Sequence, residues 1–280
     1  MMKNNFIIAL LLIIHYNSFS QKAFVPYTDI DRQNQEDIYE KAGVKSCKMT
    51  IFEYKLKLQD FEPDGRLADI YQYDENGQMT EKTAYFANAS KKEKYVYNQD
   101  MKIVQKENYL PASVLKSKEI FAYKDNGDII QSTKFNHKNT IIATTKYEYG
   151  ERTRTQITRD TLDKLKSKME IRLGVNGAIE EHFLYNWKDE MYKHEIIEYN
   201  ELGQKIKWTI IDKSFNQHNI SEYDLDEKGN IVKENVFNKD GELKRYTESK
   251  YDDHQLITES ILFSKDGAPR TKYVYEYEFY

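Results

Sequence analysis

A short pattern of aromatic, polar and aliphatic positions recurs along most of the chain. Its form is an aromatic residue, Asp or Asn, any residue, Asp or Asn, Gly, any residue and an aliphatic residue, as in residues 73–79 and 237–243. An Asp followed closely by Gly is typical of a three-residue hairpin loop, in which a type I turn precedes a residue with positive φ. The pattern therefore predicts a series of antiparallel hairpins.

The spacing of the aromatic positions predicts the face on which they lie. Successive aromatics are 12 or 14 residues apart wherever the pattern is clean. Because side chains alternate between the two faces of a strand, an even step predicts that all of them share one face. The same register predicts cross-strand contacts of Tyr73 with Met79 and of Phe237 with Leu243.

The sequence predicts one helix and a long sheet. Residues 29–43 place Ile38 and Tyr39 among polar residues and end at Gly43, which is typical of a short helix. From residue 44 onward the pattern predicts strand and turn. We expect an all-β fold, a long antiparallel up-and-down meander in a twisted, curled or partly rolled sheet, because twisted sheets curl beyond about ten strands. Residues 21–52 form the expected N-terminal segment, and residues 53–280 form a single repeat domain.

The repeat resembles the YD repeats of the RHS (rearrangement hot spot) family and, more loosely, MORN-type repeats. The residues that carry the resemblance are Tyr71-Gln72-Tyr73-Asp74-Glu75-Asn76-Gly77, Asp64-Gly65-Arg66-Leu67 and Tyr223-Asp224 with Gly229. The resemblance implies a β architecture and a location in the cell envelope or on the cell surface. It implies no catalytic residues.

Residues 1–20 have the pattern of a signal peptide. Lys3 precedes an apolar run over residues 6–14, and Ser18 and Ser20 supply small residues for cleavage before Gln21. The run is too short to span a bilayer, and no second apolar segment follows, so we expect an exported mature chain without a membrane span, periplasmic or extracellular.

Charge and composition exclude several classes of function. The net charge of −4, with both signs interleaved, disfavours a nucleic-acid-binding surface. Cys47 is the only cysteine, so no internal disulfide can form. Neither a Gly-x-Ser-x-Gly motif nor a glycine-rich phosphate loop is present. We therefore expect no catalytic residues, no cofactor and no enzymatic activity.

Two histidines are candidates for a metal site. The predicted register places His182 opposite His194, on the face away from the aromatics, with Glu181 and Glu195 pointing to the aromatic face. Two histidines across a hairpin could hold Zn²⁺ with a third ligand. The alternative, which we favour, is a solvated cross-strand pair with no metal.

Two regions are candidates for binding. Trp187 falls in a predicted turn that does not require a tryptophan, and an exposed aromatic can stack on a sugar or anchor a partner protein. The repeat is least clear at residues 150–172 and 205–222, and a specific site requires such a break in the period. The second stretch holds Trp208, Asp212 and His218.

These observations leave three functional hypotheses. The first is an exported, non-enzymatic β-repeat protein that acts as a binding or structural module of the cell envelope or surface, with another protein or a surface glycan as its partner. The second is a carbohydrate-binding or carbohydrate-processing protein. The third is an immunity or antitoxin-like partner of another secreted protein.

Overall fold

The computed structural model describes residues 37–86 and 89–280, which form one short helix and a continuous series of strands. The helix covers residues 37–42, within the segment predicted to be helical. The strands are β1 (Val44–Lys55), β2 (Asp60–Phe61), β3 (Arg66–Tyr73), β4 (Met79–Phe86), β5 (Ala89–Tyr97), β6 (Ile103–Leu110), β7 (Val114–Tyr123), β8 (Ile129–Asn136), β9 (Ile141–Tyr149), β10 (Thr153–Arg159), β11 (Leu165–Leu173), β12 (Ile179–Tyr185), β13 (Met191–Tyr199), β14 (Lys205–Asp212), β15 (Gln217–Leu225), β16 (Ile231–Asn238), β17 (Leu243–Tyr251), β18 (Ile257–Ser264) and β19 (Pro269–Phe279). A 3-10 turn at Pro111–Ser113 separates β6 from β7.

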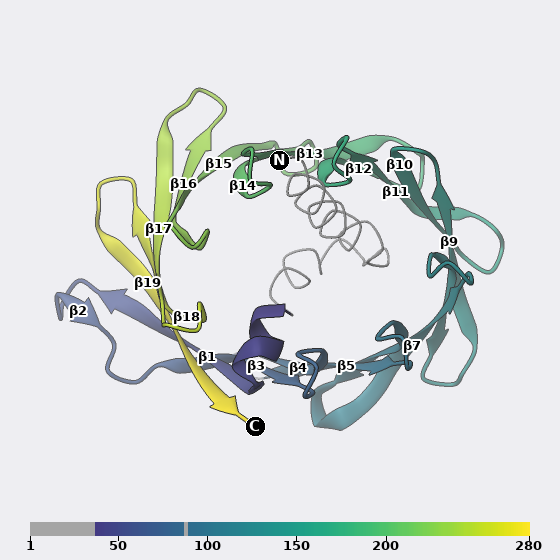
Figure 1. The fold of residues 1–280 in the computed structure, drawn as a ribbon, viewed down its shortest axis with the longest axis horizontal. Helices are drawn as coiled ribbons and strands as arrows, with labels where there is room; N and C mark the ends of the chain where they lie inside the picture. Colours follow the sequence, from purple (N-terminus) through teal and green to yellow (C-terminus); the bar gives the residue numbers. More distant parts are fainter. Residues whose placement is uncertain (1–36, 87–88) are drawn as a thin grey trace, which may run out of the picture.

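The strands close into a barrel. From β3 to β19 each strand pairs antiparallel with the next, and β1 pairs with both β19 and β3, which joins the two ends of the sheet (Figure 1). β2 pairs only with the end of β1, so eighteen of the strands in the described residues form the wall. The all-β prediction is confirmed, but the open, curled or partly rolled meander is wrong. Closure satisfies the backbone donors and acceptors that an open sheet leaves unpaired at its edges.

This closure also corrects the resemblance to the RHS family. The RHS family is the wrong resemblance, because the last strand returns to the first over a register that runs from Val44–Phe279 to Glu53–Thr271 and closes the sheet into a barrel. The two stretches in which the repeat is least clear are ordinary wall: residues 150–172 contain β10 and most of β11, and residues 205–222 contain β14 and most of β15.

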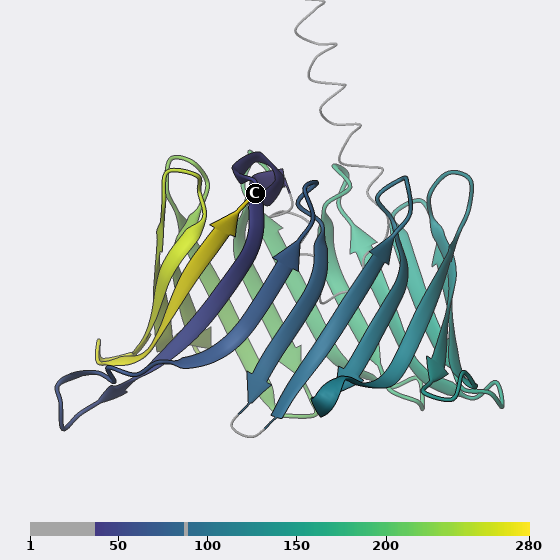
Figure 2. The same ribbon diagram turned by 90° about the horizontal axis from the view of Figure 1, so that it is seen from below.

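The helix identifies the inner face of the wall. It lies inside the ring of strands in Figure 1 and at one end of the barrel in Figure 2. The ring of Tyr39 on this helix lies 4.7 Å from the ring of Tyr73 and 6.5 Å from that of Tyr277, so both tyrosines face inward. Residues directly opposite one another on neighbouring strands share a face, so Cys47, opposite Tyr277, also faces inward.

Two clusters of buried residues pack on this inner face. One surrounds the helix and the other lies across β7 to β11. The first contains Tyr39, Val44, Cys47, Tyr73, Met79, Tyr95 and Leu256, and the second contains Phe121, Ile129, Tyr147, Met169 and Ile171. The core is therefore the lining of the barrel.

A register shift beside most of the repeat turns moves the aromatics to different faces. In the β3–β4 hairpin Gln72 lies opposite Glu81, whereas Tyr73 lies opposite Met79, so β4 has one residue without a partner in β3. Such a bulge reverses the facing of every residue that follows it. The predicted contacts of Tyr73 with Met79 and of Phe237 with Leu243 are confirmed. The prediction that all repeat aromatics share one face is wrong.

The end of the barrel that holds the helix carries a ladder of tyrosines, and we call it the tyrosine rim. Each of these tyrosines donates its hydroxyl to a backbone carbonyl of the preceding strand, at 2.6–3.0 Å. The pairs are Tyr97 with Met79, Tyr123 with Ile103, Tyr149 with Ile129, Tyr199 with Ile179, Tyr251 with Ile231 and Tyr277 with Ile257. Since the preceding strand belongs to a different hairpin of this rim, each bond joins two hairpins that share no turn there.

Candidate functional site

A row of charged and polar side chains lies on the inner face of β12, β13 and β14. His182 lies directly opposite Glu195, and both side chains are 0% exposed. The Nδ1 atom of His182 lies 3.5 Å from Oε2 of Glu195, and Nζ of Lys193 lies 2.5 Å from Oε1 of Glu195. Asp212 occupies the position opposite Lys193. We call His182, Lys193, Glu195 and Asp212 the inner polar row.

Apolar residues surround the inner polar row. Ile171 lies opposite His182 and is buried, and Ile197 follows Glu195 on the inner face of β13 and is also buried. A buried carboxylate is costly in such surroundings unless a cation pairs with it, and Lys193 supplies that cation. The low local dielectric strengthens this attraction, so the row fixes the relative positions of β12 and β13.

Trp208 and Asp212 lie on the same inner face, as alternating residues of β14. Trp208 lies opposite Ile197 and Ser221, with the ammonium of Lys205 5.4 Å from its ring centre. Asp212 ends the strand, where its Oδ1 accepts hydrogen bonds from the backbone N–H of Ser214 and Phe215 at 2.9 and 3.3 Å. The carboxylate of Asp212 therefore holds the β14–β15 turn.

His218 does not join these residues. It lies opposite Ile211, which alternates with the inward residues 210 and 212, so its side chain points to the outer face. The structure thus places Trp208 and Asp212 of the predicted site on the same face of one strand and His218 on the other face.

The predicted pairing of His182 with His194 is wrong. Glu195 lies opposite His182, and Phe183 lies opposite His194, with the Phe183 and His194 rings stacked at 4.4 Å on the outer face. The cause is the register shift between Leu184 and Tyr185, because a slip of one residue changes every cross-strand pair. The two histidines lie on opposite faces of the wall. In residues 37–86 and 89–280, no group of three or more His, Cys, Asp or Glu side chains is placed to hold a metal ion.

Trp187 lies apart from the inner polar row, in the turn between β12 and β13 at the opposite end of the barrel from the helix. Its side chain is 66% exposed, and Nζ of Lys188 lies 5.2 Å from its ring centre. Asn186 forms the turn by accepting hydrogen bonds from the backbone N–H of Lys188 and Glu190. The turn therefore does not depend on the tryptophan.

A second polar cluster on the inner face, which the sequence did not predict, is formed by Glu93, Tyr95 and Lys106. The Tyr95 hydroxyl donates to Glu93 at 2.6 Å, and Nζ of Lys106 lies 3.2 Å from the same carboxylate. Burial acts to raise the pKa of Glu93, but the Tyr95 hydroxyl and Lys106 outweigh it and hold that pKa below its usual range. The one available signal was the two-residue spacing of Glu93, Tyr95 and Tyr97, which places all three on one face.

The only cysteine of the chain is unsuited to nucleophilic chemistry. Burial raises the pKa of the Cys47 thiol from its ordinary value of 9.0 to about 12, which keeps the sulfur protonated near neutral pH. The same apolar surroundings raise the pKa of Tyr275 to about 12. Cys47 therefore packs in the lining as a small apolar residue.

Two further features lie at the tyrosine rim. A cavity of about 600 Å³ lies between the β15–β16 and β17–β18 turns and is lined in part by Asp226, Asn230, Asp252 and Asp253. Its acidic residues hold the two turns, since Asp226 Oδ1 accepts from the backbone N–H of Asn230 and Asp252 Oδ1 accepts from that of Leu256.

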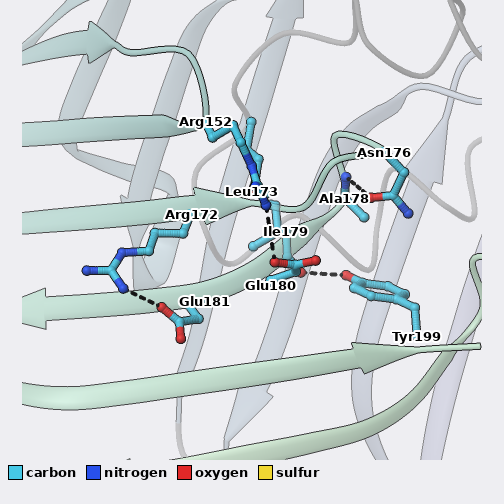
Figure 3. Close-up of polar contacts among 9 residues, drawn as sticks. All are labelled: Arg152, Arg172, Leu173, Asn176, Ala178, Ile179, Glu180, Glu181 and Tyr199. Atoms are coloured by element: carbon cyan, nitrogen blue, oxygen red, sulfur yellow. Dashed lines mark hydrogen bonds and ion pairs between the residues drawn. The ribbon is translucent and has the colours of Figure 1, made fainter.

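Figure 3 shows how the rim is completed at β11, where Leu173 ends the strand in place of a ladder tyrosine. The Nε of Arg152 donates to the carbonyl of Leu173 at 2.8 Å, and the Leu173 N–H donates back to the carbonyl of Arg152 at 2.9 Å. Tyr199 donates to Ile179 in the same view. These contacts connect neighbouring hairpins, which is a structural role.

Comparisons with solved structures give distant likenesses of low sequence identity. No family model and no curated protein matches this chain. A porin-like protein from Bacteroides uniformis is 11% identical, over 84% of this chain and 98% of that one, with a TM-score of 0.45. A porin-like protein from Bacteroides vulgatus is 9% identical, over 82% and 97% of the two chains, with a TM-score of 0.30. A putative outer membrane lipoprotein-sorting protein domain from Vibrio parahaemolyticus is 10% identical, over 89% and 91%, with a TM-score of 0.28.

All three TM-scores lie below 0.5, so no function is carried over from these proteins to this chain. Among the described residues, no helix has the length and apolar character needed to cross a bilayer.

Proposed function

We propose that this chain is an exported, non-enzymatic β-barrel that acts in water as a binding or structural module of the cell envelope. The observation that carries the proposal is the chemistry of the outer wall. Ion pairs occupy outward positions on strands all round the barrel. They include Lys48–Glu276, Lys94–Glu81, Arg172–Glu181, Lys207–Glu198 and Lys250–Glu259, at N–O distances of 2.7–3.6 Å.

This outer wall differs from that of a barrel that spans a bilayer. In a membrane barrel the outward positions form an apolar band about 25 Å tall, and a Lys or Arg at its centre costs about 2–4 kcal/mol. Exposed ion pairs add little stability of their own, but they need water around them. Their spread over five separate strand pairs therefore supports a wall that faces water.

The inner face supports binding or scaffolding rather than catalysis. Its carboxylates are held by cations, as Glu195 is by Lys193 and Glu93 by Lys106. Its only thiol is held protonated by burial. A catalytic site needs converging groups that can reach a substrate, and these carboxylates are instead paired with lysines of the wall itself.

Export rests on the sequence alone. The signal peptide predicted over residues 1–20 lies outside the described residues, and cleavage between Ser20 and Gln21 stays a prediction. Intact mass measurement of protein recovered from outside the cytoplasm tests it, since a mass that retains residues 1–20 would contradict export by this signal.

The test of the water-exposed barrel is its behaviour without detergent. Residues 21–280, produced without the signal peptide, should purify from aqueous buffer as a single species with a β-rich circular dichroism spectrum. The same preparation should produce no conductance steps in a planar bilayer. Extraction only by detergent, together with stepwise conductance, would show that the barrel spans a membrane and would overturn the proposal.

A further inference from the structure

The end of the barrel opposite the tyrosine rim carries large apolar side chains at its turns, and we call it the apolar rim. It is formed by the turns that follow β1, β4, β6, β8, β10, β12, β14, β16 and β18. Leu56 (83% exposed), Leu162 (73%) and Phe215 (74%) stand at three of these turns, and Trp187 stands at a fourth. Further exposed apolar residues lie in or beside the same turns: Leu58, Phe86, Leu110, Val114 and Ile141.

These side chains are not needed by the turns that carry them. In the β10–β11 turn, Asp160 Oδ1 accepts the backbone N–H of Leu162 and of Lys164, so an aspartate forms the turn. The same applies to Phe215, whose backbone N–H is bound by Asp212. Large apolar residues that the turns do not require are therefore available to contact a partner.

A second set of residues, on the outer wall beside this rim, has matching chemistry. Outward aromatic residues lie toward the strand ends here, and lysine ammonium groups lie 4.2–5.9 Å from their ring centres. The pairs are Tyr109 with Lys94, Phe135 with Lys118, Tyr185 with Lys168, Tyr246 with Lys233 and Phe61 with Lys272. Aromatic rings accompanied by lysines are typical of the level at which lipid headgroups meet water.

The arrangement of the apolar residues favours a flat partner. They are spread around the circumference of the barrel and separated by polar turn residues, and Figure 2 shows the turns gathered at one end of the barrel. A protein partner would require one contiguous patch with an apolar centre. A bilayer surface can receive every side chain around the ring at once. Lysines such as Lys57, Lys188 and Lys213 stand beside the tips, and acidic residues such as Asp163 and Asp189 stand in the same turns, so a bilayer surface would be met through the apolar side chains.

We propose that the apolar rim docks onto the surface of a bilayer, with Leu162, Trp187 and Phe215 inserted at headgroup depth and the aromatic–lysine pairs above them. The barrel stands on the membrane and does not cross it, so this inference rests on the proposed water-exposed wall. The tyrosine rim points away from the lipid.

The chain offers a matched control on the tyrosine rim. Met101, Val175 (93% exposed) and Leu202 (83%) are also apolar turn residues, but they lie at the other end of the barrel. The triple variant Leu162→Ser, Trp187→Ser, Phe215→Ser and the control triple Met101→Ser, Val175→Ser, Leu202→Ser each remove three exposed apolar side chains. Circular dichroism and thermal unfolding of both variants should match the parent, since none of the six side chains is in the lining.

The assay is flotation with vesicles of phosphatidylethanolamine and phosphatidylglycerol. The parent and the control triple should float with the vesicles, and the apolar-rim triple should show a partition coefficient reduced by about tenfold or more, because it loses three membrane-contacting side chains. The Trp fluorescence of the parent should also shift to shorter wavelength with vesicles, and the shift should be absent in Trp187→Phe.

Failure to float, equal loss in the two triples, or an unchanged fluorescence of Trp187 would each overturn the docking proposal. These outcomes differ from failure of the proposed function. A barrel that is a single species in aqueous buffer but does not bind vesicles contradicts only the docking proposal. A barrel that requires detergent and conducts ions contradicts both.

Discussion

The two ends of the barrel use the same repeat in opposite ways. At the tyrosine rim the repeat aromatic points inward, and a ladder hydroxyl such as that of Tyr123 is bonded to a backbone carbonyl. At the apolar rim the corresponding aromatic, such as Phe135, points outward and meets a lysine. The difference teaches that the motif determines a turn and its register shift, whereas the direction of the aromatic follows from the number of shifts that precede it.

The largest expected effect is a loss of folding stability at alkaline pH, which begins in the lining near the tyrosine rim. Burial raises the pKa of Cys47 from 9.0 to about 12 and that of Tyr275 from 10.0 to about 12. Each group is neutral below its pKa, and the unfolded chain loses these protons first. The stability that they contribute is therefore complete below pH 9 and is lost as the pH rises toward 12.

Urea unfolding at stepped pH, followed by circular dichroism, measures this loss. The free energy of unfolding should decline from about pH 9 upward, and in Cys47→Ala the decline should begin nearer pH 10, where the tyrosines start to titrate. A free energy that stays constant up to pH 12 would show that these groups are accessible to water in the folded barrel.

The next largest effect compares the stability lost when an inward aromatic is truncated with that lost when an outward aromatic is truncated. Tyr73 is 6% exposed and packs on Tyr39, whereas Tyr246 stacks on Phe263 at 4.8 Å on the outer wall. Tyr73→Ala should lower the free energy of unfolding by about 3–5 kcal/mol, and Tyr246→Ala by about 1 kcal/mol. Chemical denaturation of both variants measures these losses. A larger loss for Tyr246→Ala would mean that the inner and outer faces of the wall have been assigned the wrong way round.

The sequence was sufficient to predict the turns. Asp or Asn at the first turn position and Gly at positive φ are visible in the repeat, and the structure has positive φ at Gly77, Gly127, Gly203 and Gly241. It was also sufficient for the nearest cross-strand pair at each turn. These features depend on a few consecutive residues, which is why a single sequence contains them.

Closure and facing could not be predicted in the same way. The pairing of β1 with β19 joins residues more than 200 positions apart, and the sequence of neither strand identifies the other as its partner. A bulge leaves no mark in the composition, yet it moved Glu195 opposite His182 and put His194 on the outer face. The inner polar row was therefore missed as a unit, although Asp212 and His182 were both identified as candidates. Residues 213–216, within the stretch 205–222 where a specific site was expected, form the turn that joins β14 to β15, so deleting residues 212–220 should break the barrel.

The turn glycines of the tyrosine rim provide an effect of intermediate size. Gly203 has a φ of +76°, and a Cβ built on it meets no atom within 4 Å, so a substitution there suffers only from its backbone conformation. Gly203→Val should cost about 1–3 kcal/mol, because a β-branched residue is unfavourable at positive φ. Leu202→Val, one residue earlier at an exposed position, should change the free energy of unfolding by less than about 0.5 kcal/mol. Equal losses for the two variants would contradict the turn conformation.

The smallest effect tests the ladder itself. Tyr251 donates its hydroxyl to the carbonyl of Ile231 at 3.0 Å, and Tyr251→Phe removes this bond while the ring stays in place. The expected loss is about 0.5–1.5 kcal/mol, the net contribution of one hydrogen bond, and it should be accompanied by faster amide hydrogen exchange in β16 and β17. Tyr246→Phe, on the outer wall of β17, is the control and should leave both the stability and the exchange of β16 nearly unchanged. If both variants behave alike, the tyrosine hydroxyls do not join the hairpins, and the two rims differ only in how deeply their rings are buried.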